Sequence, residues 1–137
     1  MVKLAHRRAR GQRGFTLIEL MIVISIILIL VSIAAPIYSS SIVRAKEAVL
    51  KDDLFTMRSV IAQYTLDKQK APQSLDDLVQ AGYLKQIPMD PFTNARDSWT
   101  VDQEDVLLSV DQQQPGITDV HSGSTATSSD GTPYSSW

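Results

Sequence analysis

One acidic residue inside a long apolar run constrains this chain more than any other feature. Residues 15–37 form a run of about 23 residues whose single charged side chain is Glu19. As a helix this run is roughly 35 Å long, which is enough to cross the apolar core of a bilayer. A carboxylate within such a span costs about 3 kcal/mol on insertion scales. The next basic residue downstream is Arg44, so the economical partner for Glu19 is a group on another chain.

The charges on either side of the run predict how the chain is oriented in a membrane. Residues 1–14 contain five basic residues and no acid, whereas the rest of the chain carries a net charge of −7. Because Lys- and Arg-rich segments stay in the cytoplasm, the C-terminal part is expected on the other side. A secretory signal peptide has a shorter apolar region with a small-residue cleavage site at its far end. A single-pass anchor explains the charge and the length but leaves Glu19 unexplained.

Nucleic-acid binding by the basic N-terminal segment is the competing interpretation of its charge. The segment is short, contains no interleaved aromatic residues and is followed directly by the apolar run. Nucleic-acid interfaces combine a longer basic surface with base-contacting groups. We therefore expect no nucleic-acid partner.

The residues at the start of the apolar run carry a family resemblance. The octapeptide Arg13–Leu20, RGFTLIEL, resembles the processing site of type IV pilins and type II secretion pseudopilins. The resemblance implies that residues 1–14 are a cleaved leader, that a membrane peptidase cuts between Gly14 and Phe15, and that Phe15 is N-methylated. Glu19 of one subunit would then pair with the Phe15 amine of a neighbour. Residues 15–37 would span the membrane first and form the core of a filament later.

A proline follows near the end of the apolar run. Pro36 lies where the family commonly has a helix-loosening proline, and a proline inside a helix removes one backbone donor. A bend at the membrane exit and a loosening that lets subunits slide in a filament are both open interpretations.

The residues beyond Pro36 predict that the helix continues. Apolar residues recur at alternating four- and three-residue steps and form one stripe, with Glu47 and Arg58 expected mostly off it. The stripe comprises Leu50, Leu54, Met57, Ile61 and Tyr64. The helix is expected to end near residues 67–69, because the residue before Pro72 disfavours the helical region. Residues 38–69 are thus an amphipathic continuation of the first helical segment.

Residues 70–137 predict a small soluble domain of helix, strand and loop. Ser74 is the expected N-cap of a short helix that ends near Gly82. The two prolines within residues 87–92 predict a rigid loop. Strands are expected at Ser98–Val101 and Val106–Val110, joined by an acidic turn at residues 102–105. The fold class is therefore α+β, with a long N-terminal helix packed on a small antiparallel β-sheet and loops, as in pilins.

Residues in the middle of the chain favour one branch of this family. The order Gly82-Tyr83-Leu84, then Pro88–Phe92, then Trp99 resembles the major pseudopilins of type II secretion systems. This implies a structural subunit of a periplasmic pseudopilus that drives protein export. The implied partners are further copies of the subunit, a prepilin peptidase, an inner-membrane assembly platform, minor pseudopilins and membrane lipid before assembly. The alternative is a type IV pilin of a surface fibre for adhesion, motility or DNA uptake.

The C-terminal residues 111–137 are rich in Ser, Thr, Gly and Asp, which taken alone indicates an irregular tail. Three bulky residues in it, Val120, Tyr134 and Trp137, predict instead that the tail folds back on the domain. The chain has no cysteine, so no disulfide can hold this tail. Pilins often carry a C-terminal disulfide loop, and its absence favours the pseudopilin weakly.

A metal ion is a second way to hold the tail. Pseudopilins of this family commonly hold their C-terminal loop with calcium, which prefers six to eight oxygen ligands. The resemblance makes Asp119 and Asp130 the candidate carboxylates, with Ser122, Ser124 and the carbonyl groups of residues 125–128 completing the set. The family's usual Gly- and Asp-dense loop is not found here, so a variant loop closed by packing is the alternative.

The remaining polar residues predict neither zinc binding nor catalysis. His121 is the single histidine after the leader, and without a second histidine or a cysteine zinc is disfavoured. A solvated loop position is expected for it. The sequence contains no nucleophile–base pattern, phosphate-binding glycine loop or zinc-protease motif. We therefore expect a substrate of a peptidase that is not itself an enzyme.

Overall fold

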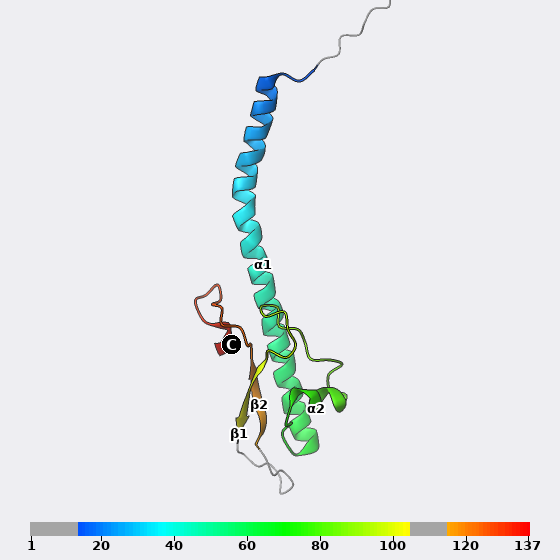
Figure 1. Cartoon of the computed structure of the whole chain (residues 1–137). Coiled ribbons are helices and arrows are strands. Elements are labelled where there is room, and N and C mark those ends of the chain that lie inside the picture. The colour runs from blue at the N-terminus through cyan, green and yellow to red at the C-terminus, as the bar shows by residue number, and fades with distance from the viewer. Residues whose placement is uncertain (1–13, 105–114) are drawn as a thin grey trace, which may run out of the picture. The chain divides into compact units, whose positions relative to one another are not determined.

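The computed structural model of the chain describes residues 14–104 and 115–137 (Figure 1). Its elements are helix α1 (Leu17–Lys68), helix α2 (Leu75–Gln80), strands β1 (Thr100–Glu104) and β2 (Gly116–His121), and the 3₁₀ turn η1 (Tyr134–Ser136). The chain divides into two compact units, Met1–Ser39 and Ser40–Trp137. The α+β class predicted from the sequence is confirmed.

The first unit contains the apolar part of α1. Thr16 caps the helix, since the Glu19 main-chain nitrogen donates to Thr16 Oγ1 at 3.2 Å. The helix passes through Pro36 without ending. In the described part of the chain, α1 is the one helix long and apolar enough to cross a membrane. The helix begins at Leu17, two residues into the predicted span, while the bend at Pro36 stays a prediction.

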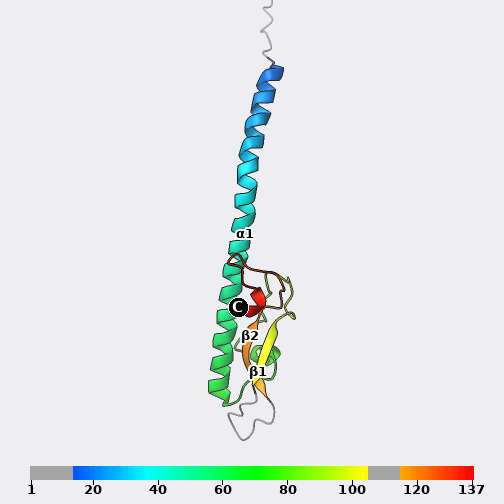
Figure 2. The same ribbon diagram turned by 90° about the vertical axis from the view of Figure 1, so that its left-hand side faces the viewer.

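The second part of α1 carries the apolar stripe on which the second unit packs. All five residues of the predicted apolar stripe are buried: Leu50, Leu54, Met57, Ile61 and Tyr64. The helix ends at Lys68, and Gln69 then adopts a φ of 55°. Both the stripe and the predicted end of the helix are therefore confirmed. Figure 2 shows the two strands running alongside this part of α1.

Helix α2 and the loop after it follow the sequence prediction. Ser74 Oγ accepts a hydrogen bond from the Asp77 nitrogen, and the Asp77 carboxylate accepts one from the Ser74 nitrogen, which is a complete capping box. Gly82 ends the turn after α2 with a φ of 83°, which suits glycine. The residues from 87 to 92 form no strand. The Trp99 indole nitrogen donates to the Pro88 carbonyl at 2.8 Å and fixes the loop.

The sheet differs from the prediction in its strand boundaries. Strand β1 starts at Thr100 and continues through Asp102–Glu104, so the acidic turn predicted there is wrong. Its partner is β2, in antiparallel register with Val101 opposite Val120 and Asp102 opposite Asp119. The predicted strand Val106–Val110 lies outside the described residues. The prediction missed β2 because its sequence, GITDVH, mixes apolar and charged residues in a segment of loop-like composition.

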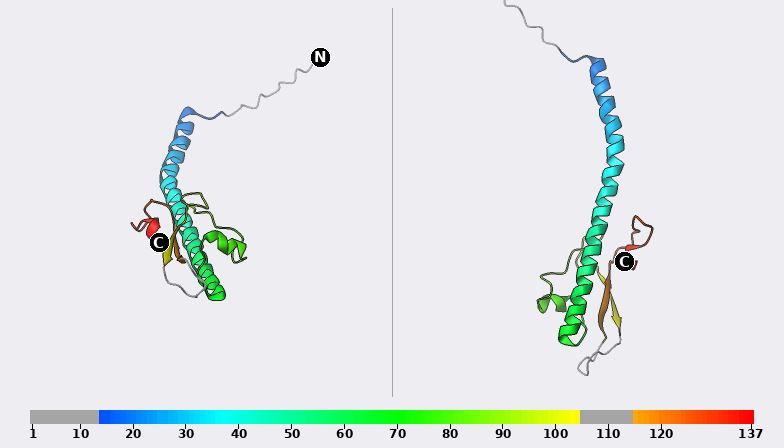
Figure 3. Two further views of the ribbon diagram at one scale, coloured as in Figure 1. Left: turned by 60° about the horizontal axis from the view of Figure 1, so that its bottom comes forward. Right: turned by 180° about the vertical axis from the view of Figure 1, so that it is seen from behind.

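The C-terminal segment folds back on the second unit, as its bulky residues predicted. Val120 and Tyr134 are buried in the core that the α1 stripe forms. The Tyr134 ring stacks on Phe92 at 3.9 Å, and the Trp137 ring meets Tyr134 edge-on at 5.0 Å. Figure 3 shows the C-terminal segment returning past the end of β2. A sheet of two strands is marginal alone, and this core gives it a helix to pack on.

A close backbone approach just after β2 gives a testable prediction. A Cβ atom at Gly123 would overlap the Ser98 carbonyl oxygen. We expect Gly123→Ala to lower the stability of the second unit by about 2 kcal/mol or more, because two backbone segments must separate. Thr125→Ala, at an exposed position of the same segment, is the matched control. Urea unfolding followed by tryptophan fluorescence tests this, and equal midpoints for both variants would contradict it.

Candidate functional site

The residues predicted for processing lie at the start of α1. Gly14 and Phe15 precede the helix, and Phe15 is 89% exposed. Among the described residues, no atom lies close enough to Gly14 to block access to it. A peptidase needs an accessible bond, and both residues are exposed.

Glu19 follows in the first turn of α1, as the sequence predicted. A carboxylate there faces the positive end of the helix dipole. Within the described residues, the Glu19 carboxylate forms no ion pair or hydrogen bond with another side chain. Around it, the apolar side chains from Leu17 to Ile37 are largely exposed. This surface needs lipid or other protein to cover it.

Glu47 fastens the C-terminal segment to α1, which the sequence did not predict. Its carboxylate accepts hydrogen bonds from the Ser129 nitrogen and hydroxyl, both at 2.7 Å, and from the Tyr134 hydroxyl at 2.9 Å. The Ser129 bonds lower the pKa of Glu47 more than burial raises it. Burial and the nearby Glu47 raise the pKa of Tyr134 to about 12. The prediction that Glu47 lies off the apolar stripe is wrong: three residues before Leu50, it shares that face.

Arg58 makes the second link between α1 and the C-terminal half of the domain. Its guanidinium donates to Asp119 Oδ1 at 2.6 Å and to the main-chain oxygens of Val120 at 3.0 Å and Trp137 at 2.7 Å. Burial works to raise the pKa of Asp119, but the Val120 nitrogen and Arg58 lower it overall. The prediction placed Arg58 mostly off the stripe and gave it no role, whereas in the structure it holds β2 and Trp137 against α1.

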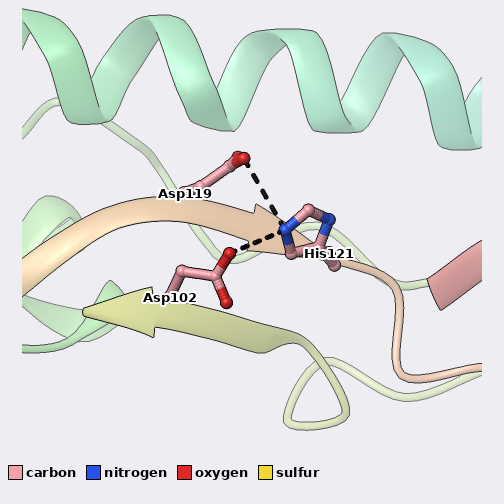
Figure 4. A group of neighbouring side chains, drawn as sticks. All are labelled: Asp102, Asp119 and His121. Carbon is pink, nitrogen blue, oxygen red and sulfur yellow. Dashed lines mark hydrogen bonds and ion pairs between the residues drawn. The ribbon is translucent and has the colours of Figure 1, made fainter. Parts of the chain in front are cut away.

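His121 lies at the end of β2 beside two carboxylates, so the predicted solvated loop position is wrong. Its Nε2 is 3.0 Å from Asp102 Oδ2 and 3.6 Å from Asp119 Oδ2 (Figure 4). Its Nδ1 is 2.6 Å from the Trp137 main-chain oxygen. Burial alone would lower the pKa of His121, but the Trp137 bond and the two carboxylates raise it above its usual value. Sequence reasoning missed this group because β2 was missed.

Comparisons with known proteins identify the family. Residues 9–35 match the prokaryotic N-terminal methylation motif. The chain is 33% identical over 104 residues to type II secretion system core protein G of Escherichia coli K12, covering 64% of this chain and 72% of the relative. The same protein of Pseudomonas aeruginosa is 36% identical over 101 residues, covering 62% and 71%. The chain belongs to the core protein G family.

Membership of the core protein G family confirms the resemblance seen in the sequence. A type IV major fimbrial protein, FimA of Dichelobacter nodosus, is also similar, with 45% identity over 62 residues, but this covers only 45% of the chain and 39% of the relative. The core protein G matches cover more of both chains, and 64% of this chain is more than the first unit, so they include part of the second unit. No solved structure matches the chain.

The two carboxylates proposed for calcium have different surroundings in this core protein G relative. Asp119 on β2 binds Arg58, whereas Asp130 accepts from Ser128 and from the nitrogen and hydroxyl of Thr132 within its own turn. These bonds lower the pKa of Asp130 to about 2. Ser122 and Ser124 are buried and hydrogen-bonded. Calcium at Asp119 and Asp130 stays a prediction, and the donors on both carboxylates favour the alternative of a loop closed by packing.

Proposed function

We propose that this protein is the structural subunit of a periplasmic pseudopilus that drives protein export by type II secretion. The observation that carries the proposal is the match to core protein G over 64% of this chain and 72% of the relative, together with the N-terminal methylation motif at residues 9–35. A subunit of this kind needs a membrane-embedded precursor form and a surface for polymerisation. The exposed apolar face of α1 and the unpaired Glu19 supply that surface.

The chemistry of assembly follows from the N-terminal residues. Cleavage after Gly14 removes a leader of net charge +5 and creates a positive amine on Phe15. Glu19 of a neighbouring subunit then has a partner of opposite charge in a low-dielectric surrounding, where such a pair is far stronger than in water. An unpaired Glu19 carboxylate raises the free energy of the isolated subunit, whereas in the polymer the carboxylate is paired. Methylation of Phe15 would keep its positive charge.

The proposed location follows from the same residues. The basic leader is expected in the cytoplasm and the unit from Ser40 onward in the periplasm, with residues 15–37 as a single-pass anchor in the inner membrane. The proposed partners are copies of the same subunit, a prepilin peptidase, the inner-membrane assembly platform, minor pseudopilins and membrane lipid before assembly. The protein acts as a structural subunit and not as an enzyme in this proposal.

Deletion of the gene in its own host tests the function. We expect the deletion to abolish secretion of folded exoproteins and to leave surface fibres, twitching motility and DNA uptake unchanged. Complementation with the wild-type gene should restore secretion. Loss of surface fibres with normal secretion would overturn the proposal in favour of the type IV pilin, for which the similarity to the fimbrial protein is the supporting observation.

Mass spectrometry of the mature chain should show a methylated Phe15 at its N-terminus.

A further inference from the structure

We propose that Asp102, Asp119 and His121 form a binding site for a divalent transition metal ion, with zinc as the expected occupant. In the described part of the chain, their ligand atoms form the one group of three that lies within 4.8 Å of one another. The three residues come from both strands of the sheet (Figure 4). This site is separate from the polymerisation surface at Glu19, and it does not depend on the proposed function.

The distances between the ligand atoms suit zinc. Zinc bonds to imidazole nitrogen and carboxylate oxygen are about 2.0–2.2 Å, so two ligands of a tetrahedral ion lie about 3.3 Å apart. His121 Nε2 is 3.0 Å from Asp102 Oδ2 and 3.6 Å from Asp119 Oδ2. An ion placed between these atoms needs only small side-chain movements. The exposed carboxylate of Asp102 leaves room for water as a fourth ligand.

The hydrogen bonds around the site orient His121 for metal binding. Two groups face His121 Nδ1: the Trp137 main-chain oxygen at 2.6 Å, which can only accept, and Arg58 Nη2 at 3.5 Å, which can only donate. The shorter contact assigns the hydrogen to Nδ1. The lone pair of the neutral ring then lies on Nε2, which faces both carboxylates. A metal-binding histidine generally has its other nitrogen hydrogen-bonded to a carbonyl or carboxylate in this way. Arg58 likewise holds Asp119 through Oδ1 and leaves Oδ2 directed at His121.

The charges on the sheet also suit a bound cation. Asp102 and Asp119 are direct cross-strand partners, and like charges in that position destabilise a sheet. Of these two carboxylates, Arg58 contacts Asp119 only, and His121 offsets their charge only when its ring is protonated. Imidazole together with carboxylates favours zinc and similar ions over calcium, which prefers a shell of oxygen ligands. The sequence disfavoured zinc because it offers a single histidine after the leader and no cysteine. Carboxylates can also bind zinc, and strand pairing brings two of them to His121.

A zinc titration of the full chain in detergent micelles tests the proposal, with a colorimetric zinc chelator as competitor. We expect one saturable zinc per chain, and a loss of affinity of about tenfold or more for both His121→Gln and Asp102→Asn. Asp102 is exposed, so its variant keeps the fold even if the histidine variant does not. His6→Gln removes the other histidine of the chain and should bind zinc like the wild type.

A second measurement separates a bound ion from an adventitious one. Zinc should raise the midpoint of thermal unfolding of the wild type and of Asp130→Asn, but not that of Asp102→Asn, because an ion that binds the folded state stabilises it. Absence of saturable binding would overturn the proposal. Undiminished binding by both His121→Gln and Asp102→Asn would overturn it too, as would affinity lost in His6→Gln or Asp130→Asn instead.

Discussion

Glu19→Ala is expected to leave cleavage after Gly14 intact and to reduce the yield of assembled filaments about tenfold or more. The variant removes the carboxylate that is costly in a membrane-embedded subunit and that a neighbouring Phe15 amine would neutralise in the polymer. Gly14 and Phe15 precede the helix, and no hydrogen bond or ion pair joins them to the Glu19 side chain among the described residues, so processing should proceed. The measurement is sheared-filament yield, with the mature N-terminus confirmed by mass spectrometry.

Two matched variants make this test specific to charge at position 19. Glu19→Gln keeps the size of the side chain and should assemble as poorly as the alanine variant, because an amide cannot pair with an amine cation. Asp52→Asn removes an exposed carboxylate elsewhere on α1 and should assemble normally. Normal filament yield from Glu19→Gln would show that size rather than charge matters, and would contradict the proposed pair.

Regular helical features were predictable because they depend on nearby residues. The buried stripe from Leu50 to Tyr64, the end of α1 near Lys68 and the Ser74 cap each follow from spacing or from one residue's hydrogen-bonding chemistry. The processing residues also belong to a short contiguous motif. Local patterns of this kind need no knowledge of the tertiary fold.

The contacts that close the domain were not predictable in the same way. Strand β2 pairs with β1 across the eleven residues 105–115, and its register places Asp102 opposite Asp119. The sequence of neither strand indicates which segment it pairs with. The burial of Glu47 was predictable, because it lies three residues before Leu50 and so on the buried face of α1. Its partners, Ser129 and Tyr134, are more than 80 residues away along the chain, and no local pattern names them.

The second large effect is expected at Glu47. Glu47→Ala should lower the stability of the unit formed by residues 40–137 by about 3 kcal/mol, because hydrogen bonds to a charged group are strong and the Tyr134 hydroxyl would be left buried without its partner. The Ser129 end of the C-terminal segment should then detach from α1. Urea unfolding of the full chain in micelles, followed by the fluorescence of Trp99 and Trp137, measures the change. Glu104→Gln, at an exposed position of β1, is the control and should unfold like the wild type.

The pH dependence of stability tests whether the charge of Glu47 is what holds the C-terminal segment. The Ser129 hydrogen bonds hold the pKa of Glu47 below its usual value of 4.5 in the folded state. The unfolded state therefore binds a proton first as the pH falls, and the stability that Glu47 contributes is complete above pH 4.5 and declines below it. Glu47→Gln has no such proton to bind. The stability difference between wild type and Glu47→Gln should be largest near neutral pH and shrink below pH 4.5. A difference that stays constant from pH 7 to pH 3 would show that the carboxylate charge does not hold the C-terminal segment.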